Sequence, residues 1–338
     1  MIMLCCWISC YSLGATVGEV DALMAQLLCK DCIVKSQQIN IPEYRQAYNP
    51  SMIPYKGGYL LSFRYRTRFP TKFKNAYRDD VSLIGVVKLD QNFKVVPKTA
   101  QILNIVSYSS DYSLTAEDAR LFNVGNRIFI IFNDIPMLNI QGLNAMYLAE
   151  LVEERGGLFA LKDQAKPLNY LYARAVEKNW SPFVADGKLY VIYSDHPRVI
   201  LEVDVNTGYC QEVTRSISHR NWDLGEIRGG TPAYLVNDQF LTVFHSSFPV
   251  ATSKGRAYVM GAYTFDKEPP FAIHAMTPNP LGDPIDYSQN NASKVVFPGG
   301  MVVEDQQIHV AWGKADYQIM ITTFDTKKLL ESMQELHE

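Results

Sequence analysis

One arrangement of apolar and polar residues recurs five times along the chain. Each copy has a small or proline-containing anchor, a short apolar run, a turn rich in Gly, Asn or Asp, and a second apolar run that ends on a polar residue. The copies cover residues 48–64, 116–134, 178–196, 228–247 and, more loosely, 297–316. Turns such as Gly125-Asn126 and Asp186-Gly187 between two apolar runs are typical of β-hairpins. The pattern therefore predicts five hairpins.

Further strand-like runs lie between the hairpins, at residues 79–90, 145–153, 198–208, 257–266 and 317–326. Each unit thus supplies about four strands, the content of one propeller blade, and the anchors are roughly 50 to 70 residues apart. A helical solenoid would space its apolar residues by three or four, and a β-sandwich would not repeat five times. We predict an all-β fold, a five-bladed β-propeller over residues 41–326. Short terminal helices are expected at 19–28 and 327–338.

The composition narrows the class of partner. The chain has 338 residues, among them 20 Tyr and 16 Phe, and a formal net charge of -3. Binding to nucleic acid needs a surplus of basic residues, so no nucleic acid is expected as a partner. Aromatic side chains suit strands, and they also suit a surface on which sugar rings stack. No apolar stretch reaches the ~20 residues that span a bilayer, so no transmembrane span is expected. The oligomeric state stays open.

The cysteines and the N-terminus leave several alternatives open. Of six cysteines, Cys29 and Cys32 form a CxxC pair, but the second pair or matched histidines of a zinc site are missing. We expect a local disulfide or two free thiols there and no metal site, with redox or metal chemistry of the pair as the alternative. Residues 1–40 are expected to be an N-terminal extension, with an apolar run that lacks a preceding Lys or Arg. A signal segment and a cytoplasmic extension both remain open, and with them the compartment.

The predicted architecture brings distant polar residues together. In a propeller the innermost strand of each blade leads away from the central axis, so the anchors of all blades gather around one mouth of the channel. The anchors supply Asn49, Glu117, Asp118, Arg120, Asn179, Trp180, Arg228 and Asp316, and Arg64, Arg66 and His245 end the adjacent second strands. Several cations that face few carboxylates suit an anion, and one acid among them is a candidate general acid.

Three segments, "EDARLF", "GGTPAYLV…VFH" and "VVFPGG…WGKAD", resemble glycoside hydrolase family 130. This group of five-bladed propellers includes mannoside phosphorylases and hydrolases, and it is related to the β-1,2-mannosyltransferases. The resemblance runs from about Asn49 to Asp316. It implies that Asp118 is the catalytic acid, with Arg120 as its neighbour, and that the proton reaches the bridging oxygen directly or through a sugar hydroxyl. It also implies that His245 helps to hold phosphate.

The resemblance assigns the remaining positions to substrate. It implies that Asp316 binds a sugar hydroxyl and that Asn49 and Arg64 contact substrate and anion. Arg228 lies one residue from the family's basic phosphate contact. Ala119 stands where the family has Pro, which changes the stiffness of the turn that presents Asp118 without removing the acid. "KNWSPF" at 178–183 replaces a basic segment found in many phosphorylases. Phosphate as the acceptor is therefore left open.

Each candidate also has a structural interpretation. Asp118 could cap a strand turn, Arg120 could be an ion-pair partner of Glu117 or Asp118, and His245 could be a satisfied histidine at a strand end. Trp180 is expected to form a pocket wall that stacks on a sugar ring, with a core tryptophan as the alternative.

We expect a carbohydrate-active enzyme that acts on a small oligosaccharide or mannoside, without a cofactor and with inorganic phosphate as a co-substrate. An inverting hydrolase needs a second carboxylate ~6.5–9.5 Å from the first, to activate water. Only Glu117 and Asp316 are obvious second acids, so phosphorolysis or transfer is favoured over hydrolysis. The alternatives are a mannosyltransferase or hydrolase on the same scaffold and a non-catalytic sugar-binding propeller.

Overall fold

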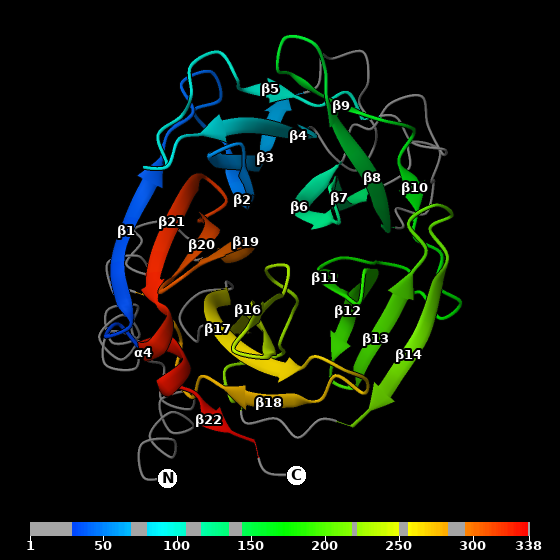
Figure 1. Cartoon of the computed structure of the whole chain (residues 1–338), viewed down its shortest axis with the longest axis vertical. Coiled ribbons are helices and arrows are strands. Elements are labelled where there is room, and N and C mark those ends of the chain that lie inside the picture. Colours follow the sequence, from blue (N-terminus) through cyan, green and yellow to red (C-terminus); the bar gives the residue numbers. More distant parts are fainter. Residues whose placement is uncertain are drawn as a thin grey trace.

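Five β-sheets are arranged in a ring around a central axis (Figure 1), which confirms the predicted five-bladed propeller. The computed structural model describes residues 29–68, 80–105, 116–134, 144–217, 222–249, 256–282 and 295–336. We number the blades 1 to 5 in chain order. Four of them begin with an inner hairpin that the sequence pattern predicts, and the fifth follows the looser copy at 297–316.

In blades 1 to 3 the strands follow in chain order from the axis outward, apart from β9 of blade 2. Blade 1 contains β2 (Tyr48–Tyr55), β3 (Gly58–Arg68), β4 (Asp80–Leu89) and β5 (Gln101–Ile102). Blade 2 contains β6 (Glu117–Val124), β7 (Arg127–Asp134), β8 (Ala145–Glu153) and β10 (Lys166–Pro167), and β9 (Phe159–Leu161) also pairs with β8. Blade 3 contains β11 (Ser181–Ala185), β12 (Lys188–Asp195), β13 (Arg198–Val203) and β14 (Cys210–Ser216).

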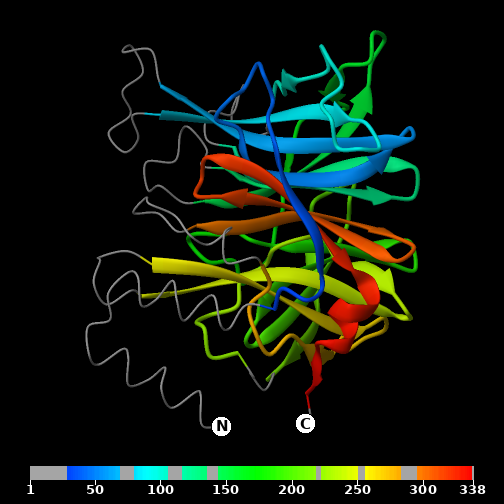
Figure 2. The ribbon, with the colours of Figure 1, turned by 90° about the vertical axis from the view of Figure 1, so that its left-hand side faces the viewer.

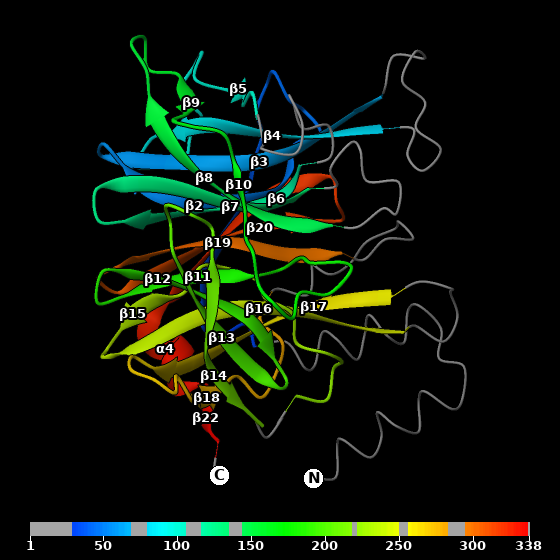
Figure 3. The same cartoon turned by 90° about the vertical axis from the view of Figure 1, so that its right-hand side faces the viewer.

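Blades 4 and 5 complete the ring. Blade 4 contains β15 (Tyr234–Val236), β16 (Gln239–Pro249), β17 (Arg256–Asp266) and β18 (Ile273–Met276), followed by β22 (Gln334–Glu335). Blade 5 contains β19 (Val296–Glu304), β20 (Gln307–Lys314), β21 (Gln318–Asp325) and β1 (Ile33–Ile39). Figure 3 looks at the side of the ring that carries the outer strands of blades 2 and 3.

The inner hairpins set the polarity of the ring. The turns of β2–β3, β6–β7 and β19–β20 lie at one face (Figures 2 and 3), so the starts of β2, β6 and β19 lie at the opposite face. Lys56 and Gly57, with φ of 46° and 78°, form the β2–β3 turn, and Asn237 and Asp238, with φ of 47° and 69°, form the corresponding β15–β16 turn of blade 4. Two successive left-handed residues match the right-handed twist of the flanking strands. The turns thereby place every anchor at the same mouth.

The core lies between neighbouring blades. Leu60 and Val86 of blade 1 pack with Leu121 and Ile130 of blade 2, and all four side chains are 0 % exposed. Successive residues of a strand point to opposite faces of its sheet, so each blade buries apolar residues against both neighbours. Since this packing holds the blades together, the axial end of the inner strands is available for polar side chains.

The N-terminal strand β1 (Ile33–Ile39) closes the ring. It pairs antiparallel with β21 as the outermost strand of blade 5, and Figure 2 shows it beside the C-terminal part of the chain. Residues 33–39 therefore belong to the propeller, which begins before the predicted boundary at residue 41. The sequence "IVKSQQI" does not alternate apolar and polar residues. This edge strand does not need that alternation, because backbone hydrogen bonds and contacts such as Ser36 Oγ to Thr322 Oγ1 at 2.9 Å hold it in place.

The C-terminal helix is shorter than the expected 327–338. Helix α4 (Thr326–Glu331) has Asp325 as its N-cap and ends at Ser332. Residues 334–335 then pair with β18, because the edge of blade 4 offers them backbone partners. The expected helix at 19–28 and the N-terminal apolar run lie outside the described residues. Among the residues that the structure describes, no helix is long and apolar enough to cross a membrane.

Candidate active site

Three blades begin with a residue in the left-handed conformation. Asn49, Asp118 and Asn179 have φ of 46°, 56° and 64°, and the first two sit in register shifts at the starts of β2 and β6. Asn and Asp tolerate this conformation better than other non-glycine residues. A shift of this kind locally changes the direction in which a side chain points. At the axis, the side chains of these anchor residues therefore depart from the regular alternation of their strands.

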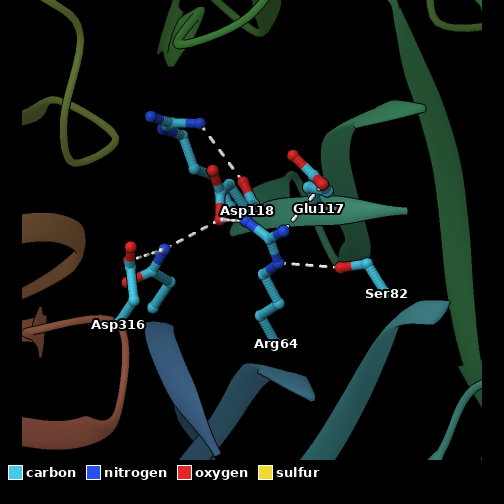
Figure 4. A network of polar contacts seen from close by, with 7 residues as sticks. Arg64, Ser82, Glu117, Asp118 and Asp316 are labelled. Atoms are coloured by element: carbon cyan, nitrogen blue, oxygen red, sulfur yellow. Dashed lines mark hydrogen bonds and ion pairs between the residues drawn. The ribbon is translucent and has the colours of Figure 1, made fainter. Parts of the chain in front are cut away.

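Asp118 lies at the centre of a polar network that joins three blades (Figure 4). Its Oδ1 accepts a hydrogen bond from Asn49 Nδ2 at 2.9 Å and lies 3.2 Å from Arg64 Nη1. The same Asn49 Nδ2 lies 3.5 Å from Oδ1 of Asp316, which follows β20 of blade 5. One amide thus connects the two carboxylates at the mouth, as the propeller geometry predicts.

Arg64 is held by acidic and hydroxyl groups on both sides. Its Nη2 donates to Glu117 Oε1 at 2.7 Å and its Nε donates to Ser82 Oγ at 2.7 Å. The guanidinium carbon lies 5.2 Å from the centre of the Tyr48 ring. With its third nitrogen on Asp118, the guanidinium is occupied at Nε, Nη1 and Nη2. Arg64 therefore orients the carboxylates and partly neutralises their charge, and these contacts engage three of its five N–H donors.

The two carboxylates differ in their pKa. Burial acts to raise the pKa of Asp118, but the charge of Arg64, the Asn49 hydrogen bond and the charge of Arg120 together lower it below its usual value. Burial and the nearby Asp118 charge raise the pKa of Asp316, which Arg64 and Arg66 only partly oppose. In the absence of substrate, Asp118 therefore loses its proton more readily than Asp316.

Arg120 connects blade 2 to blade 4. Its Nε donates to the carbonyl of Gly230 at 2.5 Å, Nη2 to that of Gly229 at 3.1 Å and Nη1 to that of Asp118 at 3.2 Å. The side chain is 0 % exposed and lies over the Phe297 ring at 5.2 Å. Burial lowers the pKa of Arg120 to about 10, against the raising effect of Asp118. These three hydrogen bonds go to backbone carbonyls, so they give Arg120 a structural role other than the expected ion pair with Glu117 or Asp118, and its charge still acts on Asp118.

Gly229 and Gly230 make that connection possible. A Cβ on Gly230 would lie 2.0 Å from the Val243 carbonyl oxygen, and one on Gly229 would lie 1.9 Å from the Asn179 carbonyl oxygen. Only glycine lets the chain pass this close to its neighbours. Asn179 is half-buried and lies just before β11, the first strand of blade 3, with its carbonyl against Gly229.

Arg228 and His245 lie side by side on blade 4. The Arg228 amide donates to the His245 carbonyl at 2.8 Å, and the reverse bond measures 3.1 Å. His245 is 3 % exposed, and its Nδ1 has no hydrogen-bond partner among the described residues. Burial first, and then the charges of Arg120 and Arg228, lower the pKa of His245 to about 3, against a raising hydrogen bond with Gly229. The imidazole is therefore neutral at physiological pH.

Arg228 is more accessible than Arg64. Its side chain is 33 % exposed, and the nearest carboxylate oxygen, on Glu226, is 4.0 Å away. Compared with Arg64, it therefore has room for a further anionic partner. Arg66, one of the other predicted cations, is exposed and lies over the Tyr48 ring at 5.8 Å.

Trp180 is a core residue and not a pocket wall. Its side chain is 0 % exposed, Nε1 donates to Glu177 Oε2 at 2.9 Å, and the ring meets Tyr193 edge-on at 5.2 Å. The expected stacking on a sugar ring is therefore not available to it. The physical reason is the strand alternation: the residue after Asn179 turns into the space between blades 2 and 3, where a large apolar ring fills the core.

Three contributors to the site were not predicted. Tyr48 lies under Arg64, its hydroxyl has no partner among the described residues, and burial raises its pKa to about 12. Ser82 accepts a hydrogen bond from Arg64, and the Phe297 ring lies against Arg120. Tyr48 could have been found, because it precedes Asn49 as Glu117 precedes Asp118 in the repeated pattern. Ser82 carries no such signal, since it lies in the third strand of blade 1.

The described residues contain no group of three His, Cys, Asp or Glu side chains placed to hold a metal ion. What these residues do provide is a buried carboxyl group, a second carboxyl beside it, an accessible guanidinium and a neutral imidazole. A carboxyl group can transfer a proton to a leaving oxygen, and a guanidinium binds phosphate or carboxylate well. The arrangement therefore suits acid-assisted cleavage of a polar bond with an anion nearby.

Solved structures resemble this fold over most of its length. A β-1,2-mannobiose phosphorylase from Listeria innocua, in complex with β-1,2-mannobiose, has a TM-score of 0.63 at 16 % identity and covers 88 % of this chain and 92 % of its own. A mannose phosphorylase from Leishmania mexicana, in complex with phosphate, has a TM-score of 0.60 at 16 % identity, with 90 % and 92 % covered. At these identities the likeness shows the fold.

A third structure comes from work on a family of mannoside phosphorylases that also contains glycoside hydrolases, which target β-1,2 mannosidic linkages in Candida mannan. It has a TM-score of 0.61 at 14 % identity, with 83 % of this chain and 85 % of the other covered. A comparison with curated protein sequences found no match. The family model described as β-1,4-mannooligosaccharide phosphorylase matches residues 29–335. The chain therefore belongs to glycoside hydrolase family 130.

Proposed function

We propose that this protein is a mannoside phosphorylase, which uses inorganic phosphate to cleave the bond between a terminal mannose and the next sugar. The observation that carries the proposal is the convergence on Asp118: Asn49 and Arg64 of blade 1 both contact its carboxyl group, and Asn49 extends the contact to Asp316. A single acid held in this way at the axial mouth suits general acid catalysis. Membership of family 130 supports mannosides as the substrate class.

In the proposed reaction Asp118 supplies the proton that the bridging oxygen receives, directly or through a sugar hydroxyl. A phosphate oxygen attacks the anomeric carbon while the bond to the bridging oxygen breaks. The products are mannose 1-phosphate and the shortened mannoside. Sugar binding removes water from Asp118, and this desolvation favours the protonated form that the step requires. Asn49 and Asp316 would hold sugar hydroxyls, and Glu117 would keep Arg64 in place.

Phosphate would bind beside Arg228 and His245. Arg228 is the accessible cation on blade 4, and a guanidinium can form two parallel hydrogen bonds to phosphate. His245 is neutral, and Nδ1 is its ring nitrogen without a partner among the described residues. If the other ring nitrogen keeps its proton toward Gly229, Nδ1 is an acceptor, which suits a phosphate or sugar hydroxyl.

One observation favours hydrolysis as a second candidate. Arg64, a cation that the resemblance assigns to substrate and anion, is engaged by Glu117, Asp118 and Ser82. If Arg64 does not contact phosphate, Arg228 has less help in holding it, and fewer guanidinium contacts bind phosphate less strongly. Water could then take the place of phosphate, with Glu117 or Asp316 as the base.

The test is a product analysis. The protein is incubated with β-linked mannobioses with and without phosphate, and mannose and mannose 1-phosphate are measured. We expect mannose 1-phosphate only when phosphate is present, and no product from Asp118→Asn. Turnover that needs no phosphate would establish the hydrolase. Turnover only from mannose 1-phosphate or a nucleotide sugar as donor would establish a transferase, and binding without turnover a sugar-binding propeller.

A further inference from the structure

Two thiols lie in contact at the seam where the ring closes. Cys29 Sγ and Cys32 Sγ are 3.7 Å apart, and the Cys32 thiol also lies 3.6 Å from the Cys29 carbonyl oxygen. A disulfide has an S–S distance of about 2.05 Å, so the sulfurs need to approach by about 1.6 Å. Both cysteines are free in this structure.

The backbone around the pair is held on both sides. The Cys29 amide donates to the Pro280 carbonyl at 2.8 Å, and the Cys32 carbonyl accepts from the Asp325 amide at 2.8 Å. Between them the Ile33 amide closes a turn on the Lys30 carbonyl at 2.9 Å. The turn leads directly into β1 (Ile33–Ile39), the strand that completes blade 5. The two sulfurs are therefore kept together by contacts to blades 4 and 5.

The two thiols have different surroundings. Cys32 is 1 % exposed and belongs to the core, whereas Cys29 is half-buried at its edge. The hydrogen bond from the Cys32 thiol lowers the pKa of Cys29 to about 6, with help from Ser332 and against the effect of burial. The contact with Cys29 and burial raise the pKa of Cys32. An accessible thiolate beside a buried thiol is the arrangement of a thiol–disulfide exchange pair.

We propose that Cys29 and Cys32 form a thiol–disulfide exchange site, in which Cys29 is the attacking thiol and a low-molecular-weight disulfide is the oxidant. The contact between the two sulfurs, the access to Cys29 and the fixed turn carry this assignment. It concerns a region apart from the axial mouth and does not depend on the proposed mannosidase chemistry.

The reaction proceeds in two balanced steps. The Cys29 thiolate attacks one sulfur of a small disulfide RSSR, forms a mixed disulfide and releases RS⁻, which takes up a proton. The Cys32 thiol then loses its proton and attacks Cys29 Sγ, which releases the second RSH. The protein dithiol loses two electrons and the small disulfide gains them. The resulting Cys29–Cys32 disulfide locks the turn that presents β1 to β21.

Peptide mapping of the full chain tests the proposal. The folded protein is incubated with oxidised glutathione, quenched with acid and digested after Glu19, Lys30 and Lys35. This separates residues 20–30 from 31–35 and also from the N-terminal cysteines at positions 5, 6 and 10. We expect the two peptides to be joined by a disulfide, with loss of two hydrogens and no bound glutathione. Dithiothreitol should restore both thiols.

Two comparisons make the result specific. In Cys32→Ser, glutathione should remain on Cys29, because the resolving thiol is missing. Cys210 is an internal control: it is buried and alone, and burial raises its pKa to about 12, so iodoacetamide at pH 7 should alkylate Cys29 at least tenfold faster. If Cys32→Ser does not fold, the peptide map of the wild-type protein still shows whether Cys29 and Cys32 become joined by a disulfide.

Recovery of both cysteines as unlinked thiols after incubation with oxidised glutathione would overturn the proposal. So would a stable glutathione adduct on wild-type Cys29, because it would show that Cys32 does not resolve the mixed disulfide. Alkylation of Cys29 no faster than that of Cys210 would overturn the assignment of Cys29 as the attacking thiol.

Discussion

Asn49 and Asp118 lie 69 residues apart in the chain and on neighbouring blades, yet a hydrogen bond of 2.9 Å joins Asn49 Nδ2 to Asp118 Oδ1. Both residues begin an inner strand in the left-handed conformation. The contact therefore joins equivalent positions of two successive blades. A side chain of blade 1 thus helps to position the proposed acid of blade 2.

Replacement of Asn49 by Ala should lower kcat by about 100-fold, the lower range of what a positioned acid contributes. The variant removes the amide that holds Asp118 and reaches toward Asp316. Steady-state phosphorolysis of mannobiose measures the effect. Asn123→Ala is the matched control, since Asn123 is exposed further along the same strand as Asp118. An Asn49→Ala enzyme with wild-type kcat would contradict the proposed role of this contact.

Arg64→Gln should change the pH profile as well as the rate. Arg64 is the largest of the influences that lower the pKa of Asp118, so its loss raises that pKa. A general acid works while it is protonated, and the alkaline limb of kcat/KM should therefore move to higher pH while the maximal rate falls. Arg127→Gln, on a rim arginine paired with Glu150, should leave the profile in place. A limb that moves to lower pH would count against Asp118 as the acid.

Asp316→Asn should stabilise the folded protein at pH 7 while it impairs turnover. The pKa of Asp316 is raised in the folded state, so ionisation of this carboxyl costs stability as the pH rises through the folded pKa. We expect a Tm increase of about 2 °C at pH 7 and no increase at about pH 3, below the ordinary pKa of Asp. Scanning calorimetry at both pH values decides, and an equal shift at both would refute the electrostatic explanation.

Arg120→Met should destabilise the propeller strongly. The substitution leaves the carbonyls of Gly229, Gly230 and Asp118 without their donors in a fully buried place. Loss of a buried network of this kind costs about 3–5 kcal/mol, or about 5–10 °C in Tm. Arg127→Met, at a half-exposed position of the same blade, should shift Tm by less than about 2 °C. Similar Tm values for the two variants would mean that Arg120 does not tie the blades together.

His245 should make the fold sensitive to acid. Its pKa falls to about 3 in the folded protein, so the unfolded chain takes up a proton below about pH 6.5 that the folded chain excludes. Stability that is present above pH 6.5 is therefore lost as the pH falls toward 3. Between pH 7 and 4.5, the Tm of His245→Gln should fall by less than the Tm of the wild type. His274→Gln, at an exposed histidine, should behave like the wild type, and identical losses in all three proteins would oppose this account.

The sequence by itself determined the architecture and the identity of the anchors. Hairpins depend on local properties, an apolar alternation with period two and turn residues that accept a left-handed backbone, and both can be counted along the chain. Five such units close into a ring, and ring closure then implies that Asn49, Asp118 and Asp316 converge. Their contacts confirm that expectation.

Only the tertiary structure decided what each anchor does. Trp180 follows Asn179 directly, yet it lies in the core, because the space between two blades sets its surroundings. Arg64 is engaged by Glu117 and Ser82, and His245 is neutral, because charge and burial depend on neighbours that the fold brings from other strands and blades. The strand β1 joins blade 5 through backbone hydrogen bonds, which leave no mark in the pattern of side chains.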